Sequence, residues 1–363
     1  MRTLIRPTGF VDSPFGHDGK VARAAGGLGW FGVVELIRVE GRVRVSSELV
    51  PVEGIEARFD DAMIADWARS IAPRAPLVMG QRTIRLDQPH VMGIINATPD
   101  SFSGDGLLSQ PDPRGGDPAS VAIAAGVALA KSMVEAGADI IDIGGESTRP
   151  GHAEIDLPDE AVRVVPLIRA VRSALPDVPI SIDTTKPGVA AAAIEAGAGL
   201  INDVWGVADD VSMVQLAARH RVPIVLMHNR ADAQYKDLVA EVVADLGSAI
   251  ERALSAGIAW NDILIDPGFG FGKTPEHNLA ILRELHQLAL LGRPIVLGTS
   301  RKSTLGKVLD LPADQRLEAT LATTALGIAG GADIVRVHDV RENVRAARMA
   351  DAVVRGTWQE EAR

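Results

Sequence analysis

Residues 179–203 read PISIDTTKPGVAAAAIEAGAGLIND, which is a short apolar run, an Ala-rich stretch and a second apolar run. Similar units recur from about residue 76 onward, with stretches of helical period between successive apolar runs. The eight runs are Val91–Ile95, Asp139–Ile143, Pro179–Ile182, Gly199–Ile201, Pro223–Met227, Ile263–Ile265, Pro294–Leu297 and Ile334–Val337. Eight strand-then-helix units favour a closed parallel barrel over an open sheet. The sequence therefore predicts an α/β fold: a (β/α)8 TIM barrel with a small N-terminal α+β extension.

The composition fits such a barrel and excludes several classes of protein. Of the 363 residues, 47% are hydrophobic but 4% are aromatic, so we expect an aliphatic core of the kind found in parallel sheets. The formal net charge of −10, without a Lys/Arg-rich block, argues against a nucleic-acid partner. The absence of cysteine excludes disulfides, zinc fingers, iron–sulfur clusters and cysteine nucleophiles. The start lacks a signal-peptide core and no apolar run is long enough to span a membrane, so we expect a cytoplasmic protein without a membrane partner.

The first 75 residues have a different pattern from the rest of the chain. Residues Val34–Val45 alternate with period two around Glu40-Gly41, which predicts a β-hairpin. Residues Asp60–Ile71 predict a short helix that Asp60 or Asp61 caps. Its expected apolar stripe consists of Met63, Ile64 and Trp67.

Two loops complete this division of the chain. The glycines of GGLGWFG (26–32) indicate an ordinary turn, because no helix pattern follows them as it would in a phosphate loop. Residues 107–118, rich in Pro, Gly and Asp, predict a long mobile loop. We therefore divide the chain into an N-terminal extension of unknown role (1–75) and a barrel (76–363).

Polar side chains follow nearly every apolar run, at the point where each predicted strand ends. They are Asn96, Gly144-Gly145-Glu146-Ser147-Thr148-Arg149, Asp183, Asn202-Asp203, Met227-His228, Asp266, Ser300-Arg301-Lys302-Ser303, and Arg336 with His338. In a barrel all these positions lie at the C-terminal mouth, where active sites of this fold are built. One such residue can be a helix cap, but unrelated capping is a poor account of eight. We predict one shared site.

The acceptors of this site indicate a ligand with several N–H donors. Asp183, Asn202 and Asp266 offer two carboxylates and an amide deep in the mouth. A 2-amino-4-oxopyrimidine ring would satisfy them, whereas carboxylates buried with no cation beside them would be costly. Asp203 is better explained as a cap of the next helix. Asp142 is open to two interpretations: a polar group paired inside the barrel, or a residue of the site.

The donors of the site suit an anion. Arg149, Arg336 and His338 supply positive charge and N–H groups for phosphate or pyrophosphate. Lys302 lies in a strand-to-helix turn, where free backbone N–H groups also favour anions. Its neighbour Arg301 is better explained as a surface ion-pair residue, and Arg149 alone could be a solvated loop residue.

A glycine-rich stretch and the remaining histidines are weaker candidates for a functional site. The stretch GFGFGK (268–273) is glycine-rich but is not a Walker loop, because no Ser or Thr directly follows Lys273. The remaining histidines lack His-x-x-x-His spacing, and we interpret them as surface or packing residues. They are His17, His90, His152, His220, His277 and His286.

Several of these stretches also resemble the signatures of one enzyme family, the dihydropteroate synthases. MGIINATPDSFSGDG (92–106) and ADIIDIGGESTRPG (138–151) resemble the first two signatures of that family. Further blocks follow in the family's order: ISIDTTKP (180–187), LINDVWG (200–206), LMH (226–228), LIDPGFGFGK (264–273), GTSRKS (298–303) and IVRVHDV (334–340). The resemblance covers about residues 85–355. It implies a barrel enzyme that joins 6-hydroxymethyl-7,8-dihydropterin pyrophosphate to p-aminobenzoate in folate biosynthesis and is a target of sulfonamides.

The resemblance also implies a role for each matching residue. The catalytic set would be Asp183, Lys302, Arg336 and His338. The pterin ring would be held by Asp183, Asn202, Asp266 and Lys302, with Met227 packing near it. Arg336 and His338 would bind the pyrophosphate. Asn96 would help to ligate Mg2+ on the pyrophosphate. Phe271 and Ser303 would contact p-aminobenzoate, and Thr148, Arg149 and Pro150 would belong to a mobile loop over the site.

Two departures from the family pattern affect the rim of the site. The first loop reads Ser-Gly-Asp-Gly where Ser-Asp-Gly-Gly is commoner, which leaves the role of Asp105 open. LMH is followed by Asn229-Arg230 where Met-Gln is frequent. The first 75 residues match no part of the family pattern.

Two rival functions share part of this evidence. A pterin-dependent methyltransferase barrel would have the same pterin acceptors, but need not keep GTSRKS and ESTRPG together. A non-catalytic barrel that acts as a binding partner is the second alternative, and the retained polar set argues against it. We expect a homodimer.

Overall fold

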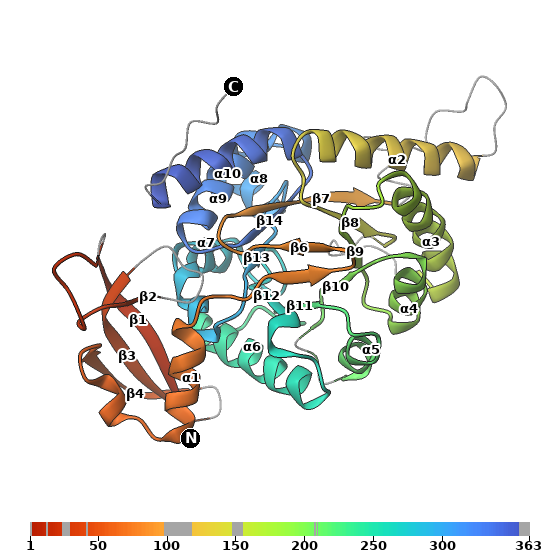
Figure 1. Cartoon of the computed structure of the whole chain (residues 1–363). Helices are drawn as coiled ribbons and strands as arrows, with labels where there is room; N and C mark the ends of the chain where they lie inside the picture. Colours follow the sequence, from red (N-terminus) through yellow and green to blue (C-terminus); the bar gives the residue numbers. More distant parts are fainter. Residues whose placement is uncertain are drawn as a thin grey trace.

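The computed structural model of the chain describes residues 2–11, 14–23, 30–40, 43–97, 118–146, 155–206, 208 and 210–355. Eight parallel strands form a ring with helices around it, and a small sheet lies to one side (Figure 1). The strands of the ring are β7 (His90–Asn96), β8 (Ile140–Gly144), β9 (Ile180–Asp183), β10 (Leu200–Asp203), β11 (Ile224–Met227), β12 (Ile263–Asp266), β13 (Val296–Leu297) and β14 (Ile334–Val337). Each predicted run overlaps one of them, so the predicted barrel is confirmed.

The strand order closes the sheet into a barrel. The strands follow one another as β12-β11-β10-β9-β8-β7-β14-β13. A parallel bridge between Ile265 of β12 and Ile295, one residue before β13, joins the two ends of this order. All eight strands of the ring are parallel, so their carboxyl ends lie at the same mouth of the barrel.

Helices cover the outside of the barrel between successive strands. They are α2 (Pro118–Glu135), α3 (Leu157–Ala174), α4 (Pro187–Ala196), α5 (Ser212–His220), α6 (Leu238–Ser255), α7 (Pro275–Arg283), α8 (Ser303–Leu309), α9 (Leu317–Ala329) and α10 (Val340–Arg355), with the 3-10 turns η3 (Trp260–Asp262), η4 (Leu285–Leu291) and η5 (Ala313–Gln315). Several begin at a side-chain cap that satisfies a free backbone N–H. Asp156 caps α3 at 2.9 Å and Asp237 caps α6 at 3.2 Å, while Thr274 and His277 form a capping box on α7.

Alternate strand residues fill two separate apolar layers. Ile141, Ile143 and Ile180 pack outward against the helices in the main core. The interior of the barrel holds a second cluster made of Met92, Ile140, Leu200, Val225, Leu264, Val296 and Ile334. Strand side chains alternate between faces, so each strand supplies both layers.

A hairpin closes the N-terminal end of the barrel. It consists of β5 (Leu77–Met79) and β6 (Arg82–Ile84), which pair antiparallel. Leu77, Met79 and Ile84 are buried in the same cluster as the interior strand residues. The sequence interpretation did not predict this hairpin. Because it fills the bottom of the barrel with apolar side chains, the polar mouth is left at the opposite end.

The N-terminal extension forms a sheet and a helix with a core of their own. The sheet contains β1 (Arg2–Val11), β2 (Ala22–Arg23), β3 (Trp30–Glu40) and β4 (Val43–Pro51), followed by η1 (Ile55–Arg58) and α1 (Asp61–Ile71). The predicted hairpin is confirmed as β3 and β4, which pair antiparallel. The predicted helix is also confirmed, since the Met63 backbone N–H donates to Asp60 at 2.9 Å.

Two details of this extension differ from the sequence prediction. Strand β1 was not predicted, although it pairs along most of β3. Ile64 is 41% exposed, so the expected apolar stripe is wrong at that position; Trp67, at 3% exposed, and Met63 pack in the core of the extension as expected. The glycine stretch at 26–32 falls largely outside the described residues.

The extension docks on the barrel far from the mouth. Arg74, buried at the end of the extension, pairs with Asp333, which directly precedes β14. Arg69 of α1 lies over the ring of Trp260 at 5.1 Å, and Phe10 meets His286 edge-on at 5.6 Å. Asp333, Trp260 and His286 all precede barrel strands in the chain, so these contacts lie at the N-terminal side of the barrel.

Helix α2 is the one helix, among the described residues, that is long and apolar enough to cross a membrane. It lies beside β7 and α3 as part of the helical layer (Figure 1). Its Gly126 packs closely on the Leu167 side chain of α3, which is the contact expected between neighbouring barrel helices.

Candidate active site

The carboxyl ends of neighbouring strands bring the predicted acceptors together. Asp183 at the end of β9 is the register partner of Asn202 in β10. Met227 at the end of β11 is in register with Asp266 at the end of β12. All four are buried, with exposed fractions of 3–6%. The structure thus gathers the residues to which the sequence analysis assigned the pterin ring.

Arg336 connects two carboxylates inside this pocket. Its Nε donates to Oδ2 of Asp142 at 2.6 Å, and its Nη2 donates to Oδ2 of Asp183 at 2.5 Å. This agrees with the interpretation of Asp142 as a polar group paired inside the barrel, and its partner Arg336 is itself a residue of the predicted site. Arg336 is thus a cation beside two of the buried carboxylates, a pairing that was not predicted from the sequence.

One oxygen of each carboxylate remains unsatisfied. Oδ1 of Asp142 and Oδ1 of Asp183 are buried and have no hydrogen-bond partner among the residues that the structure describes. A buried acceptor without a donor costs about 1–3 kcal/mol. Burial and the neighbouring Asp142 raise the pKa of Asp183 to about 7, against the opposing charge of Arg336. The pocket is therefore built for a ligand that brings N–H groups to Asp183.

Lys302 stands at the other side of the pocket, directly before α8. Its Nζ donates to the Phe269 carbonyl and lies 4.5 Å from the centre of the Phe271 ring. Burial lowers the pKa of Lys302 to about 8, although the charge of Asp266 opposes the shift. Asp266 in turn accepts the Gly268 N–H at 2.7 Å, and burial raises its pKa.

The glycines of residues 268–272 allow the loop after β12 to follow this tight path. Gly268, Gly270 and Gly272 have φ values of 68°, 87° and 52°, in the left-handed region that favours glycine. A Cβ on Gly268 would collide with the His228 carbonyl, and one on Gly270 would press on the Lys302 stem. The glycine-rich motif is thus a close-packed turn that places Phe271 beside Lys302.

His338 is held by Ser300 at the end of the neighbouring strand. The His338 backbone N–H donates to Ser300 Oγ at 3.2 Å, and Oγ lies 2.9 Å from His338 Nδ1. A Ser300 hydroxyl that donates to Nδ1 leaves Nε2 as the N–H donor of the ring. Arg301 pairs with Asp339 at 2.6 Å, so the ion-pair interpretation of Arg301 is confirmed.

Other predicted residues are placed less centrally or are not described. Asn96 lies half-buried at the end of β7, and Ser303 is exposed at the first position of α8. Asp203 does not cap a helix as expected: it accepts the Trp205 N–H at 2.9 Å in the turn after β10. Thr148, Arg149, Pro150 and Asp105 lie outside the described residues, as does most of the predicted loop 107–118.

Two charged groups near the mouth were not predicted from the sequence. In the first, Lys186 Nζ donates to Glu146 at 2.5 Å and to the fully buried Glu160 at 2.8 Å, while Glu146 accepts the Ile155 N–H at 3.0 Å. Glu146 and Ile155 flank residues 147–154, so this cluster joins the two ends of that segment. Lys186 stands in the quoted ISIDTTKP block, which was the available signal.

The second missed group surrounds Lys273, whose Nζ lies 2.9 Å from His228 Nδ1. The ring of His228 also approaches Asp245, with Nε2 3.3 Å from the carboxylate. His228 was noted as a strand-end residue and Lys273 as the end of the glycine motif, but sequence gave no reason to join them.

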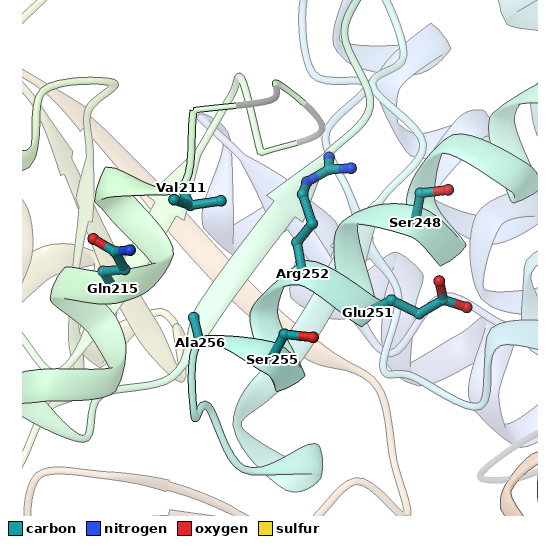
Figure 2. Close-up of a pocket in the computed structure, with 7 residues that line it drawn as sticks. All are labelled: Val211, Gln215, Ser248, Glu251, Arg252, Ser255 and Ala256. Carbon is teal, nitrogen blue, oxygen red and sulfur yellow. The ribbon is translucent and has the colours of Figure 1, made fainter.

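A groove between α5 and α6 lies on the outer surface of the barrel. Figure 2 shows its lining residues, which come from these two helices and the turns beside them. They are Val211, Gln215, Ser248, Glu251, Arg252, Ser255 and Ala256. The groove contains none of the strand-end side chains, so the mouth of the barrel remains the candidate site.

A barrel mouth with buried acceptors, two cations and a histidine N–H defines an enzyme site for a nitrogen heterocycle that carries negative charge. The sequence profile of the pterin binding enzymes matches residues 92–338. The dihydropteroate synthases of Clostridium beijerinckii and Bacillus subtilis are 48% and 47% identical over 278 and 264 residues. These alignments span 76% and 73% of this chain and 96% and 88% of the two relatives.

Solved structures agree with the sequence relatives. A Clostridium difficile dihydropteroate synthase in the presence of pteroic acid is 47% identical, with a TM-score of 0.67 over 74% of this chain and 97% of that one. A Xanthomonas albilineans dihydropteroate synthase with 4-aminobenzoic acid is 41% identical, with a TM-score of 0.69 over 77% of this chain and 97% of that one. The chain belongs to the dihydropteroate synthase family of pterin binding enzymes.

Proposed function

We propose that the protein condenses 6-hydroxymethyl-7,8-dihydropterin pyrophosphate with p-aminobenzoate to give 7,8-dihydropteroate and pyrophosphate. The observation that carries the proposal is the unsatisfied Oδ1 of Asp183, buried beside Asn202 and near Arg336. An aminopyrimidine edge supplies the N–H donors that this oxygen lacks. The likeness to enzymes solved with pteroic acid, 4-aminobenzoic acid and 7,8-dihydropteroate supports the same chemistry.

The pterin end of the substrate would bind at the centre of the mouth. Asp183 and Asn202 would face its N–H groups, and Asp266 would take a further donor on the opposite wall. The ammonium of Lys302 would donate to the pterin carbonyl oxygen. Met227, in register with Asp266, would pack against the ring.

The pyrophosphate would extend toward the ends of β7 and β14. His338 would donate its Nε2–H there, and Arg336 would add positive charge from below. Mg2+ fits this end of the site: the amide oxygen of Asn96 is the hard ligand that the ion prefers, and Mg2+ is often bound through one or two protein ligands with substrate phosphates and waters. The ion would neutralise charge on the pyrophosphate oxygens.

The aniline would enter beside Phe271 and Ser303. In the reaction the nitrogen of p-aminobenzoate forms a bond to the pterin methylene carbon as the carbon–oxygen bond to pyrophosphate breaks. The nitrogen then loses one proton to solvent. Asp183 would stabilise a pterin ring that becomes more cationic as the leaving group departs, so no strong general base is required.

A turnover assay tests the proposal. The purified protein with Mg2+ and both substrates should release dihydropteroate and pyrophosphate in equal amounts, and a sulfonamide should compete with p-aminobenzoate. Methyl transfer from methyltetrahydrofolate to a corrinoid, without pyrophosphate release, would instead support the methyltransferase alternative. Binding of both ligands without turnover would support the non-catalytic one.

We also propose that the protein is a homodimer. Three successive helices carry large apolar side chains that are 47–68% exposed: Val308 and Leu309 on α8, Leu326 on α9, and Met349 and Val353 on α10. Helices α9 and α10 lie against each other (Figure 1), and gathered exposed apolar groups mark interaction surfaces. Light scattering should give twice the chain mass, and Leu326→Glu should reduce it to one.

A further inference from the structure

The side chains Arg230, Asp245, His228 and Lys273 form a continuous polar chain behind the loop of residues 268–272; we call it the Arg230–Lys273 network. It begins at the position where Arg230 departs from the family pattern. Arg230 donates to Asp245 twice, from Nε at 3.0 Å and from Nη2 at 2.7 Å. All four side chains are buried or half-buried, so their contacts are shielded from water.

The tautomer of His228 follows from its two neighbours. Burial lowers the pKa of His228 to about 4, so its ring is neutral near pH 7. Its Nε2 lies 3.3 Å from the Asp245 carboxylate, which can only accept, so Nε2 carries the hydrogen. Nδ1 is then an acceptor, and it receives a hydrogen from Lys273 Nζ at 2.9 Å.

Lys273 connects the network to the loop of residues 268–272. Its Nζ also donates to the Gly268 carbonyl at 3.2 Å and to the Phe271 carbonyl at 3.1 Å. An ammonium has three N–H donors, and these three acceptors use all of them. Burial lowers the pKa of Lys273 to about 7, against the charge of Asp266, so the ammonium with all three donors is the main form below that pH.

Tyr235, which lies beside the network, holds the end of the loop. The Tyr235 hydroxyl donates to the Gly272 carbonyl at 2.7 Å. The guanidinium of Arg230 lies 4.6 Å from the centre of the Tyr235 ring and also donates to Glu241 at 2.8 Å. The carbonyls of Gly268, Phe271 and Gly272 are therefore all bound from one side.

The opposite side of the loop faces the active site. The Phe269 carbonyl accepts from Lys302, and the Phe271 ring lies against the Lys302 ammonium. Gly270 N–H donates to Asn278 at 2.7 Å. A displacement of the loop would therefore move Phe271, which we assigned to p-aminobenzoate, more than the strand-end carboxylates that hold the pterin.

We propose that the Arg230–Lys273 network is a positioning device that sets the affinity for p-aminobenzoate by fixing the loop that carries Phe271. This inference rests on the proposed function. Its four members are positioning residues, because they act through the loop and touch no reacting atom.

Lys273→Met tests the proposal, because methionine keeps the length of the side chain and removes every donor. We expect the KM for p-aminobenzoate to rise about tenfold, equivalent to about 1.4 kcal/mol, while the KM for pterin pyrophosphate stays within about twofold. Lys273→Gln keeps an amide donor and should recover part of the loss. Lys131→Met, on an exposed lysine of α2, is the matched control and should change neither constant.

Hydrogen exchange of the peptide that contains residues 268–273 gives a readout independent of turnover. Lys273→Met should speed exchange there and leave the β9–β10 peptides unchanged. Equal rises in both KM values, or unchanged exchange in the loop, would overturn the proposal. A wild-type protein without dihydropteroate synthesis would refute the proposed function, while the exchange data would still decide whether the network fixes the loop. If Lys273→Met does not fold, Tyr235→Phe, which removes only the bond to Gly272, decides by the same two readouts.

Discussion

Replacing Asp183 by Asn should separate catalysis from stability. The variant keeps the size of the side chain and one acceptor oxygen, but removes the negative charge that faces Arg336 and that we propose faces the pterin. Arg336 does not lose all compensation, because its Nε still donates to Asp142 at 2.6 Å. We therefore expect Asp183→Asn to fold normally and to lose activity.

The structure gives the size of both effects. A hydrogen bond to a charged group contributes about 1.5–3 kcal/mol, so the loss of the charged acceptor should lower kcat/KM by roughly 10- to 150-fold. Burial raises the pKa of Asp183 to about 7, well above the value near 3.8 of a free carboxyl. A carboxyl with a raised folded-state pKa destabilises the fold progressively as the pH rises from about 4 to 7, by roughly 4 kcal/mol as an upper bound. Removing its charge should therefore leave the Tm at pH 8 unchanged or higher.

Steady-state kinetics with both substrates and thermal unfolding at pH 8 measure these quantities. Asp314→Asn, on an exposed aspartate of η5, is the matched control and should alter neither. Near-normal turnover by Asp183→Asn would remove Asp183 from the site. A large fall in Tm would show that the Arg336–Asp183 ion pair stabilises the fold. It would refute the argument that the Asp183 charge destabilises the fold and serves ligand binding.

Three further predictions concern pH, binding order and the extension. The profile of kcat/KM against pH should fall below about 7, as Asp183 gains a proton, and above about 8, as Lys302 loses one; Lys302→Arg should shift the alkaline limb upward. Calorimetric titration should show p-aminobenzoate binding only when pyrophosphate with a pterin product analogue, or pterin pyrophosphate, is already present; equal affinity without them would mean a preformed aniline pocket. A chain that begins at Pro76 keeps the β5–β6 hairpin in the barrel and should retain turnover, since we propose that residues 1–75 donate no catalytic group; a folded but inactive truncation would contradict this.

The barrel could be predicted from the sequence because its strands are buried on both faces. Such strands appear as continuous apolar runs, and the eight runs stand out between Ala-rich helices whichever strand pairs with which. The position of Asp183, Asn202 and Asp266 at one mouth follows from parallel strands alone. This is why the acceptor pocket was predicted without any knowledge of distances.

The missed elements lack such local signals. Strand β1 is stabilised by pairing with β3, nearly 30 residues away in the chain, as in the register pair Arg6 and Glu35. The β5–β6 hairpin has three residues in each strand, too few for a period to be counted. It is fixed by the apolar interior of the barrel, into which Leu77 and Met79 insert. Both elements depend on surfaces that exist only after the chain has folded.

The partners of Arg336 could not be predicted from the sequence, and the reason is geometric. The sequence places Asp142 and Arg336 within strands and Asp183 directly after one, but it does not show that β8, β9 and β14 direct these side chains to one point inside the barrel. The alternation of side chains between strand faces decides which residues meet. Asp142 and Arg336 occupy inward positions one layer below the mouth, and Arg336 reaches up to Asp183. A cation placed there satisfies one oxygen of each carboxylate and leaves the other free. Two anions without it would be too costly to bury, and a fully paired Asp183 would have nothing left to offer a ligand. The same arginine therefore allows the acceptor pocket to fold and leaves it able to bind, which is why neither role could be assigned to it from its place in the chain.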